Sequence, residues 1–313
     1  MDGRLDELAW READWTADFV DIEGEDRPQP PLLTRVKMLW DDEYFYVGAE
    51  LREPRLWATL TRHDAVIFRD HDFEAFIDPN GDSHEYYEFE INALGTTWDL
   101  LLPRPYKDGG RPIDSWEIPG LKSAVSLDGS LNDPTDTDRG WSVELAFPWK
   151  VLGELARCPA PPSDGDQWRV NFSRVEWPLQ VVEGRYQKVP GRRESNWVWS
   201  PQGVVDMHRP ESWGYVQFST GPAGAASFRP DPTLAARRWL HAVYYAQRER
   251  RRLHRRWART LHDLGVEGPT EAGLGNATME VTADLFQASV ELRLPGGRIQ
   301  RWNIRQDALV WPD

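Results

Sequence analysis

The segment from Asp72 to Asn92 constrains the fold more than any other part of this 313-residue chain. It reads DFEAFIDPNGDSHEYYEFEIN and contains two runs of alternating polar and apolar residues around a Pro-Asn-Gly-Asp turn. Alternation with a period of two, bounded by turn residues, predicts a β-hairpin with strands at 72–78 and 86–92.

The two faces of the second strand of this hairpin differ in their chemistry. Successive side chains of a strand point to opposite faces, so one face carries Tyr87, Phe89 and Ile91. The other face carries Glu88, Glu90 and Asn92. The apolar face is predicted to belong to the core, and the polar row is the first place to look for a binding site.

Further segments alternate in the same way, and helical periodicity is almost absent before residue 230. These segments are 32–40, 44–51, 97–102, 121–127, 141–148 and 168–176. Many short strands separated by turn signals predict an all-β fold, a two-sheet antiparallel β-sandwich over residues 1–222.

The chain changes character in its C-terminal part. Residues 231–263 lack glycine and place apolar residues at helical spacing, which predicts one long amphipathic α-helix. This segment contains nine arginines against three acids. A β-hairpin is predicted over 285–304, and we expect residues 223–313, the helix and this hairpin, to pack on the acidic sandwich.

Composition narrows the classes of partner. The net charge of −14 argues against nucleic acid and against an anionic membrane surface, and no apolar run reaches membrane-spanning length, so no membrane insertion is expected. The single cysteine, Cys158, excludes an intramolecular disulfide framework. Some of the 17 tryptophans are expected at a ligand surface, although most should be core residues. The sequence opens without a leader, so we expect a cytoplasmic protein or an exported one whose leader lies outside this sequence.

Several motifs together resemble the family 9 carbohydrate-binding modules. They are Asp-Gly-x-Leu-Asp-Glu-x-x-Trp at 2–10, VKMLWDDEYFYV at 36–47, FEAFIDP at 73–79, WSVE at 141–144 and PESWG at 210–214. The segments NWVWSPQG at 196–203 and MHRP at 207–210 resemble the family-9-like proteins more closely. The resemblance implies a sandwich that binds sugar on one sheet face, commonly at a chain end, with structural calcium in some members.

The resemblance also carries over individual positions. The family's sugar-binding glutamate falls on Glu74, its arginine position on Glu90 and its glutamine position at or near Ser173. Its two sugar-stacking tryptophans fall near Phe68 and Met207. It further implies a monomeric bacterial protein of polysaccharide metabolism, extracellular or periplasmic.

The strand phases predict one shared polar face that binds carbohydrate. Carboxylates accept hydrogen bonds from neighbouring hydroxyls, and aromatic rings cover the C–H faces of a sugar. The shared face is expected to carry Glu74, Glu88, Glu90, Asn92, Glu144, Asn171 and Ser173. With Trp197 and Trp199 as the stacking platform, the predicted ligand set is Glu74, Glu88, Glu90, Asn92, Asn171, Arg174, Trp197, Trp199 and His208.

Two other functions remain open at this point. A glycan-degrading enzyme similar to glycoside hydrolases would use two carboxylates of the same face, with Glu74, Glu90 and Glu144 as candidates. Haem binding through His208 and Met38 is a remote alternative. Arg174 and Glu176 are equally compatible with a plain ion pair at a strand end.

A calcium site is predicted in the turn of the central hairpin. Asp78, Asn80 and Asp82 place oxygen ligands at every second residue, which is a spacing that calcium loops use. The same residues also favour a simple turn, because Asn-Gly is a good turn sequence.

Overall fold

The computed structural model describes residues 1–156, 158–222 and 224–313, and the chain divides into two compact units. The first unit contains residues 1–80, 85–103 and 111–227. The second contains 81–84, 104–110 and 228–313. No helix among the described residues is both long and apolar enough to cross a membrane.

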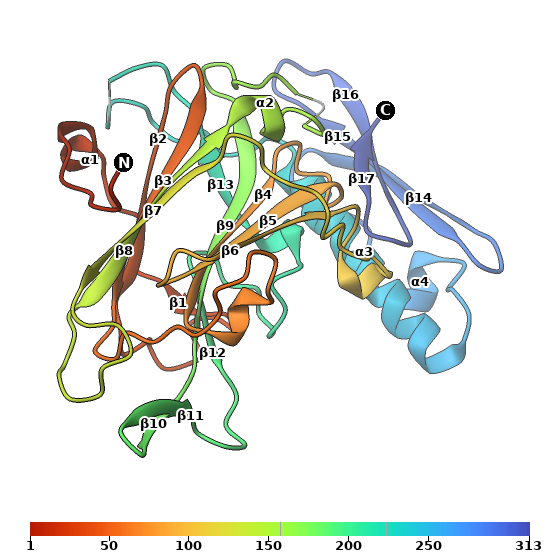
Figure 1. Cartoon of the computed structure of the whole chain (residues 1–313). Helices are drawn as coiled ribbons and strands as arrows, with labels where there is room; N and C mark the ends of the chain where they lie inside the picture. The colour runs from red at the N-terminus through yellow and green to blue at the C-terminus, as the bar shows by residue number, and fades with distance from the viewer. Residues whose placement is uncertain (157, 223) are drawn as a thin grey trace. The chain divides into compact units, whose positions relative to one another are not determined.

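Among its described residues, the first unit contains two large antiparallel sheets that form separate layers (Figure 1), besides one two-stranded hairpin. The seven-stranded sheet has the order β1-β12-β9-β4-β5-β6, and β13 also pairs with β9. Its strands are β1 (Val20–Asp21), β12 (Ser195–Val198), β9 (Gln167–Glu176), β4 (Asp72–Asp78), β5 (Tyr86–Asn92), β6 (Thr97–Leu102) and β13 (Gly214–Gln217). The four-stranded sheet has the order β2-β3-β8-β7, with bounds Thr34–Trp40, Tyr44–Arg52, Gly140–Pro148 and Lys122–Asp128.

The main hydrophobic core lies between these two sheets, and the predicted all-β sandwich is confirmed. Phe89 and Phe172 of the seven-stranded sheet share this core with Val47 and Phe147 of the four-stranded sheet. The rings of Phe89 and Phe147 meet edge to face with centroids 5.5 Å apart. Burial of such large apolar side chains is the dominant stabilising term of the fold.

The outer face of the seven-stranded sheet, which faces away from the four-stranded sheet, has a smaller apolar cluster of its own. Phe76 and Tyr86 project from it and contact Trp213, with ring centroids 5.5 Å and 5.1 Å away. The Trp213 indole N–H donates to the carbonyl of Met207 at 2.8 Å, which fixes the segment that covers this end of the face. Part of this sheet is therefore buried on both faces.

Short elements connect the strands. In the first unit they are the α-helices α1 (Leu8–Glu12) and α2 (Trp149–Leu152), the 3₁₀-helices η1 (Ile67–Arg69) and η3 (Pro210–Ser212), and the hairpin β10–β11 (Leu179–Val182 and Arg185–Lys188). The N-terminal segment approaches β7 so closely that a Cβ at Gly3, where φ is +84°, would lie 2.5 Å from backbone atoms of Val125 and Ser126. Only glycine fits this position of the N-terminal motif.

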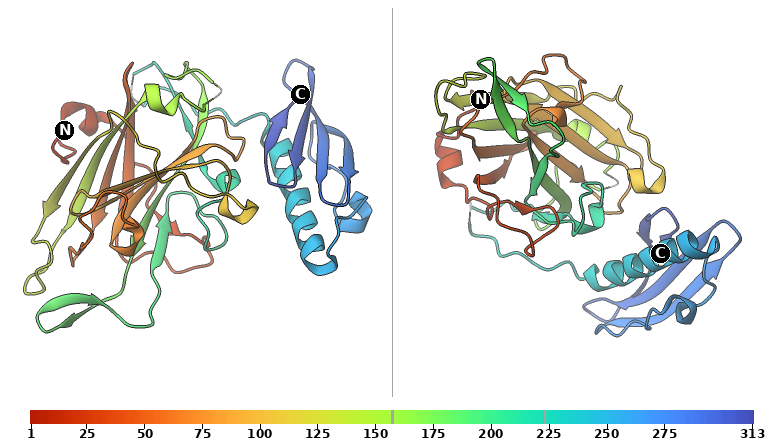
Figure 2. Two further views of the ribbon diagram at one scale, coloured as in Figure 1. Left: turned by 45° about the vertical axis from the view of Figure 1, so that its right-hand side comes forward. Right: turned by 90° about the horizontal axis from the view of Figure 1, so that it is seen from below.

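The second unit packs a long helix on a sheet (Figure 2). Its sheet has the order β14-β15-β16-β17, with bounds Leu274–Val281, Phe286–Arg293, Ile299–Arg305 and Val310–Pro312. Leu240 and Tyr244 of α3 (Leu234–His254) are buried against Val290 and Ile304 of the sheet. The 3₁₀-helix η2 (Tyr106–Asp108) also belongs to this unit. The docking of residues 223–313 on the sandwich stays a prediction.

The predicted helix over 231–263 is too long. The helix α3 ends at His254 because Arg255 adopts the left-handed conformation, with φ 58°. A separate short helix, α4 (Leu261–Leu264), follows, and Gly265 ends that helix rather than the long one. Arginine seldom adopts a left-handed backbone, so no residue type at this position predicts the break.

Candidate functional site

Four acidic side chains project from the outer face of the seven-stranded sheet. We call Asp72, Glu74, Glu88 and Glu90, which lie on β4 and β5, the carboxylate cluster. Glu74 stands directly opposite Glu90 on one side and Ser173 of β9 on the other. One carboxylate oxygen from each of Asp72, Glu74 and Glu90 lies within 4.8 Å of the others. No member of the cluster is more than 4 % exposed.

The carboxylate cluster carries little compensating positive charge. Among the described residues, one basic side chain comes within 4 Å of the cluster. It is His208, whose Nε2 lies 3.9 Å from Glu88 Oε1. Burial raises the pKa of Glu74 to about 7. Burial, followed by repulsion from Glu74, raises the pKa of the other three carboxyl groups well above the ordinary values. The cluster therefore favours protons or a ligand that supplies positive or hydrogen-bonding groups.

Some polar atoms of this region accept from backbone N–H groups, and others face a neighbouring carboxyl group. Asp72 Oδ1 accepts from the Val175 backbone N–H at 3.0 Å, and Glu90 Oε2 accepts from the Phe68 N–H at 2.8 Å. In contrast, the side chains of Asp72 and Ser173 face Glu74, and the side chain of Glu88 faces Glu90. Two carboxyl groups that face each other are satisfied when they share a proton or when a ligand supplies hydrogen-bond donors.

Aromatic side chains lie beside the cluster. Phe68 of η1, 38 % exposed, is held next to Glu90 by its own backbone N–H. Trp98 of β6 is half-buried and is the cross-strand partner of Glu90. The sequence predicted the strand but did not single out Trp98. The signal was its alternation in phase with Leu100 and Leu102, which places it on the outer face.

His208 lies at the edge of the cluster, as part of the predicted ligand set. Its Nδ1 is 2.8 Å from the Tyr86 hydroxyl, and its ring meets Phe76 edge to face. Met38 instead packs against the core between the two sheets. The two residues therefore lie on opposite sides of the seven-stranded sheet and cannot hold one haem, which corrects that alternative.

The two asparagines of the predicted set have structural partners. Asn92 Nδ2 donates to the Leu60 carbonyl at 2.9 Å and to Asp70 Oδ2 at 3.0 Å, fixing the loop before η1. Asn171 Nδ2 donates to the Ser200 carbonyl at 2.8 Å, and its Oδ1 accepts from the Ser200 N–H at 2.9 Å. Both lie on the predicted face, but their hydrogen-bonding groups are already used to hold the loops over it.

Glu144 does not share this face, and its prediction as a neighbour of Glu74 is wrong. It belongs to β8 of the four-stranded sheet. Its Oε1 accepts from the Trp10 indole N–H at 3.1 Å, and its Oε2 accepts from the backbone N–H groups of Asp2 and Gly3 at 3.0 Å and 3.3 Å. Glu144 thus fastens the N-terminal segment, which explains the spacing of the N-terminal motif and the WSVE segment.

The predicted stacking platform also faces elsewhere. Trp197 is buried in the core between the sheets, and Trp199 packs against the same core with its ring centroid 5.9 Å from that of Phe172. The pairing of Trp197 with Arg174 on β9 sets this phase, opposite to that of Ser173. Two rings enclosed by the core cannot stack on a sugar beside Glu74.

Arg174 is a structural residue rather than a ligand-binding one. It is 1 % exposed, and its Nη2 pairs with Glu53 at 2.6 Å and with Glu176 at 2.9 Å. Its Nη1 donates to the Arg52 carbonyl at 2.8 Å and to Thr34 Oγ1 at 3.1 Å. These contacts join β9 to the other sheet, and the ion-pair interpretation of Arg174 and Glu176 is confirmed.

The predicted calcium residues are distributed over both units of the chain. Asp78, which ends β4, and Asn80 belong to the first unit, whereas Asp82 belongs to the second. Asp82 Oδ1 accepts from the His84 backbone N–H at 2.9 Å, as in an ordinary turn. Calcium binding by Asp78, Asn80 and Asp82 stays a prediction.

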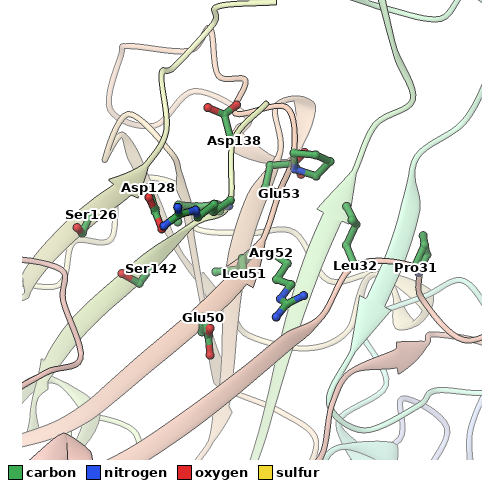
Figure 3. Close-up of a pocket in the computed structure, with 14 residues that line it drawn as sticks. Pro31, Leu32, Glu50, Leu51, Arg52, Glu53, Ser126, Asp128, Asp138 and Ser142 are labelled. Carbon is green, nitrogen blue, oxygen red and sulfur yellow. The ribbon is translucent and has the colours of Figure 1, made fainter. Parts of the chain in front are cut away.

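A separate hollow of about 690 Å³ lies beside the four-stranded sheet (Figure 3). Its lining includes Leu32, Arg52, Asp128 and Ser142, and the Asp128 side chain is 67 % exposed. It is a second place where a ligand could lie. Its lining residues are not those of the carboxylate cluster, so variants can tell the two places apart.

The fold and these sites define an antiparallel β-sandwich with a polar cluster on one sheet face. The family model described as carbohydrate family 9 binding domain-like matches residues 1–160, slightly more than half of the chain. The chain therefore belongs to the carbohydrate family 9 binding domain-like family.

Individual relatives match parts of the chain. It is 28 % identical over 181 residues to an exoglucanase, XynX, of Acetivibrio thermocellus, covering 56 % of this chain and 14 % of that protein. It is 30 % identical over 116 residues to endo-1,4-beta-xylanase A of Thermoanaerobacterium saccharolyticum, covering 37 % of this chain and 8 % of that protein. The chain thus spans a small part of the curated relatives that it matches.

Solved structures are also similar. A family 9 carbohydrate-binding module from Caldicellulosiruptor kristjanssonii in complex with cellotriose gives a TM-score of 0.45 at 16 % identity, covering 74 % of this chain and 94 % of that one. A putative carbohydrate-binding protein from Bacteroides uniformis gives 0.48 at 18 % identity, covering 68 % and 89 %.

Proposed function

We propose that this chain binds carbohydrate on the outer face of the seven-stranded sheet, at the carboxylate cluster. Membership of the carbohydrate family 9 binding domain-like family supports binding as the activity. One observation supports the location: the buried carboxylate oxygens of the cluster include Glu90 Oε2, which accepts from the backbone N–H of Phe68, whose ring is 38 % exposed. A sugar offers both complements, hydroxyl donors for the oxygens and C–H faces for a ring.

The proposed roles follow from position. Glu74 and Glu90 accept hydrogen bonds from sugar hydroxyls, because they stand opposite each other on neighbouring strands. Phe68 and Trp98 contact the apolar faces of the sugar from either side of Glu90. Asn92 and Asn171 hold the loops that border the site.

A glycoside hydrolase is the less favoured function. Of its three candidate carboxylates, Glu144 belongs to the other sheet and is engaged by the N-terminal segment. The matching family model also describes a binding domain.

The matched relatives are an exoglucanase and a xylanase, so β-glucan and xylan fragments are the first ligands to test. We also propose that the chain acts outside the cytoplasm, where such polysaccharides occur. An array of these glycans, followed by chromatography of every glycan that the full chain retains, tests the proposal. Intact glycans support binding, shortened glycans would make the protein an enzyme, and no retained glycan would contradict the proposal.

A further inference from the structure

A smaller cavity of about 290 Å³ lies where β3 and β9 end and the β10–β11 hairpin begins. Its walls are largely apolar and include Trp177 and Leu179, from the connection into this hairpin. It shares Leu32 and Glu53 with the hollow shown in Figure 3, whereas His71 lines the cavity and not the hollow. A concave, mainly apolar site with a few placed polar groups is the usual form of a small-molecule site.

His71 has one ring nitrogen without a hydrogen bond. The side chain is 2 % exposed, and its Nε2 lies 3.0 Å from the backbone carbonyl of Trp177. Because a carbonyl oxygen only accepts hydrogen bonds, Nε2 carries a proton and donates it. Burial lowers the pKa of the imidazole, which favours its neutral form, so Nδ1 is an acceptor. This buried atom has no hydrogen-bond partner and indicates a site for a ligand that donates one.

The carboxyl groups beside His71 do not supply this donor. Glu53 Oε2 lies 3.5 Å from Nδ1, longer than the roughly 3.2 Å limit of ordinary hydrogen bonds. The same oxygen accepts from Arg174 Nη2 at 2.6 Å. The carboxyl group of Glu53 also faces that of Glu176, which is the partner for any proton that these two acids share. A hydroxyl group bound in the cavity would satisfy Nδ1.

The charges around the cavity are balanced, which favours a neutral ligand. Its two acids, Glu53 and Glu176, both pair with Arg174, at 2.6 Å and 2.9 Å. A second guanidinium group, that of Arg55, also lines the cavity and donates to the Leu179 carbonyl at 3.0 Å. Buried charges are normally paired, and here two acids already have two guanidinium groups. A metal ion or an ammonium group would therefore add an unbalanced positive charge.

We propose that this cavity binds one neutral monosaccharide, a hydroxyl of which donates to His71 Nδ1. A volume of about 290 Å³ is at the small end of the roughly 300–1,000 Å³ that ligand pockets span, which fits one sugar ring rather than a chain. Glu176, 15 % exposed, accepts from a second hydroxyl. Trp177 and the prolines of the lining contact the C–H groups of the sugar. The site is separate from the carboxylate cluster and does not depend on the function proposed there.

The test follows the histidine ring nitrogens of the full chain by NMR, with isotopically labelled histidine. Glucose, xylose, glycerol, glucosamine and zinc chloride are titrated separately. We expect at least one of the two neutral sugars to shift the Nδ1 resonance of His71, because its lone pair gains a hydrogen bond. Glycerol should bind at least tenfold more weakly. The resonance is assigned by its loss in His71→Gln, and calorimetry of the same titrations counts the bound molecules.

Three variants locate the bound sugar. His71→Gln keeps an N–H donor for the Trp177 carbonyl but removes the Nδ1 acceptor, so binding in the cavity should weaken at least tenfold. Ser195→Phe, at the half-buried start of β12, should block the cavity while His71 stays in place. His63→Gln is the matched control, because His63 lines neither the cavity nor the hollow, and it should bind like the parent chain.

Glu74→Gln distinguishes this site from the carboxylate cluster. If both places bind a monosaccharide, the parent chain takes up two molecules, and His71→Gln and Glu74→Gln each take up one. If the cavity alone binds it, Glu74→Gln behaves like the parent chain. Failure of the carbohydrate proposal at the cluster is then visible without failure of the cavity.

Three results would overturn the assignment. The first is an unshifted His71 Nδ1 resonance with both neutral sugars. The second is binding by His71→Gln and Ser195→Phe with the stoichiometry and affinity of the parent chain, which would place the sugar elsewhere. The third is a preference for glycerol, glucosamine or zinc chloride over both neutral sugars, which would make the cavity a site for another class of ligand.

Discussion

Arg174→Met should destabilise the first unit severely, although the residue touches no proposed ligand. The guanidinium is 1 % exposed and pairs with Glu53 at 2.6 Å and Glu176 at 2.9 Å. Removing one partner of a buried ion pair costs about 3–5 kcal/mol, because the other charge remains buried. At about 2–4 °C per kcal/mol for a unit of this size, the melting temperature should fall by about 6–20 °C.

The loss of stability caused by Arg174→Met should depend on pH, and the direction of this dependence follows from the pKa of Glu53. Burial, followed by repulsion from Glu176, raises the pKa of Glu53 from 4.5 to about 7, and the charges of His71 and Arg174 keep it from rising further. The raised pKa means that stability falls as pH rises through 4.5 to 7. Without Arg174 the pKa of Glu53 rises further and this loss extends above pH 7. The destabilisation by Arg174→Met should therefore be smaller at pH 5 than at pH 8.

Scanning calorimetry of the full chain at pH 5 and pH 8 measures the change in melting temperature. Two further variants are measured beside Arg174→Met. Glu53→Gln/Arg174→Met should regain at least half of the lost stability, since it no longer buries an unpaired acid. Arg27→Met is the matched control: its pair with Glu23 is largely exposed, so its melting temperature should stay close to that of the parent chain. A cost below 1 kcal/mol for Arg174→Met, or a double variant no more stable than the single one, would refute the reasoning.

Two further predictions concern other buried acids. Glu144→Ala should cost about 2–4 kcal/mol in chemical denaturation, because the Trp10 indole N–H and two backbone N–H groups lose their acceptor; full stability would contradict the anchoring role. Asp99, whose pKa is raised to about 6 mainly by burial, makes stability fall as pH rises from 3.8 to 6. Asp99→Asn should flatten this dependence and be about 1–3 kcal/mol more stable at pH 7, since an amide oxygen can still accept from Ile118; an unchanged pH profile would contradict it.

Alternation alone was enough to predict the central hairpin. The predicted strands at 72–78 and 86–92 coincide with β4 and β5, and Tyr87, Phe89 and Ile91 do lie in the core. Strand periodicity reports which residues share a face, and the hairpin turn fixes the register. It does not report what covers the opposite face, so the burial of the carboxylate cluster beneath distant loops was not predictable.

The errors in the predicted site have a common cause. The segments around Glu144 and Glu74 both alternate between polar and apolar residues, but no local pattern indicates that β8 and β4 belong to different sheets. The prediction that Trp197 and Trp199 lie on the polar face used no partner strand, and only a partner strand determines which face of the sheet each side chain occupies. Pairing with β9 decides that phase and directs both rings to the core. Long-range strand pairing therefore carries the information that the sequence patterns lacked.

The most direct test of the central claim is calorimetric titration of the full chain with cello- and xylo-oligosaccharides, repeated for two carboxylate variants. Glu74→Gln removes a charge from the carboxylate cluster, and Asp128→Asn removes one from the separate hollow. We expect the parent and Asp128→Asn to bind an oligosaccharide with the same affinity, and Glu74→Gln to bind it at least tenfold more weakly. Unchanged binding by Glu74→Gln, together with loss of binding by Asp128→Asn, would contradict the account and move the sugar site to the hollow.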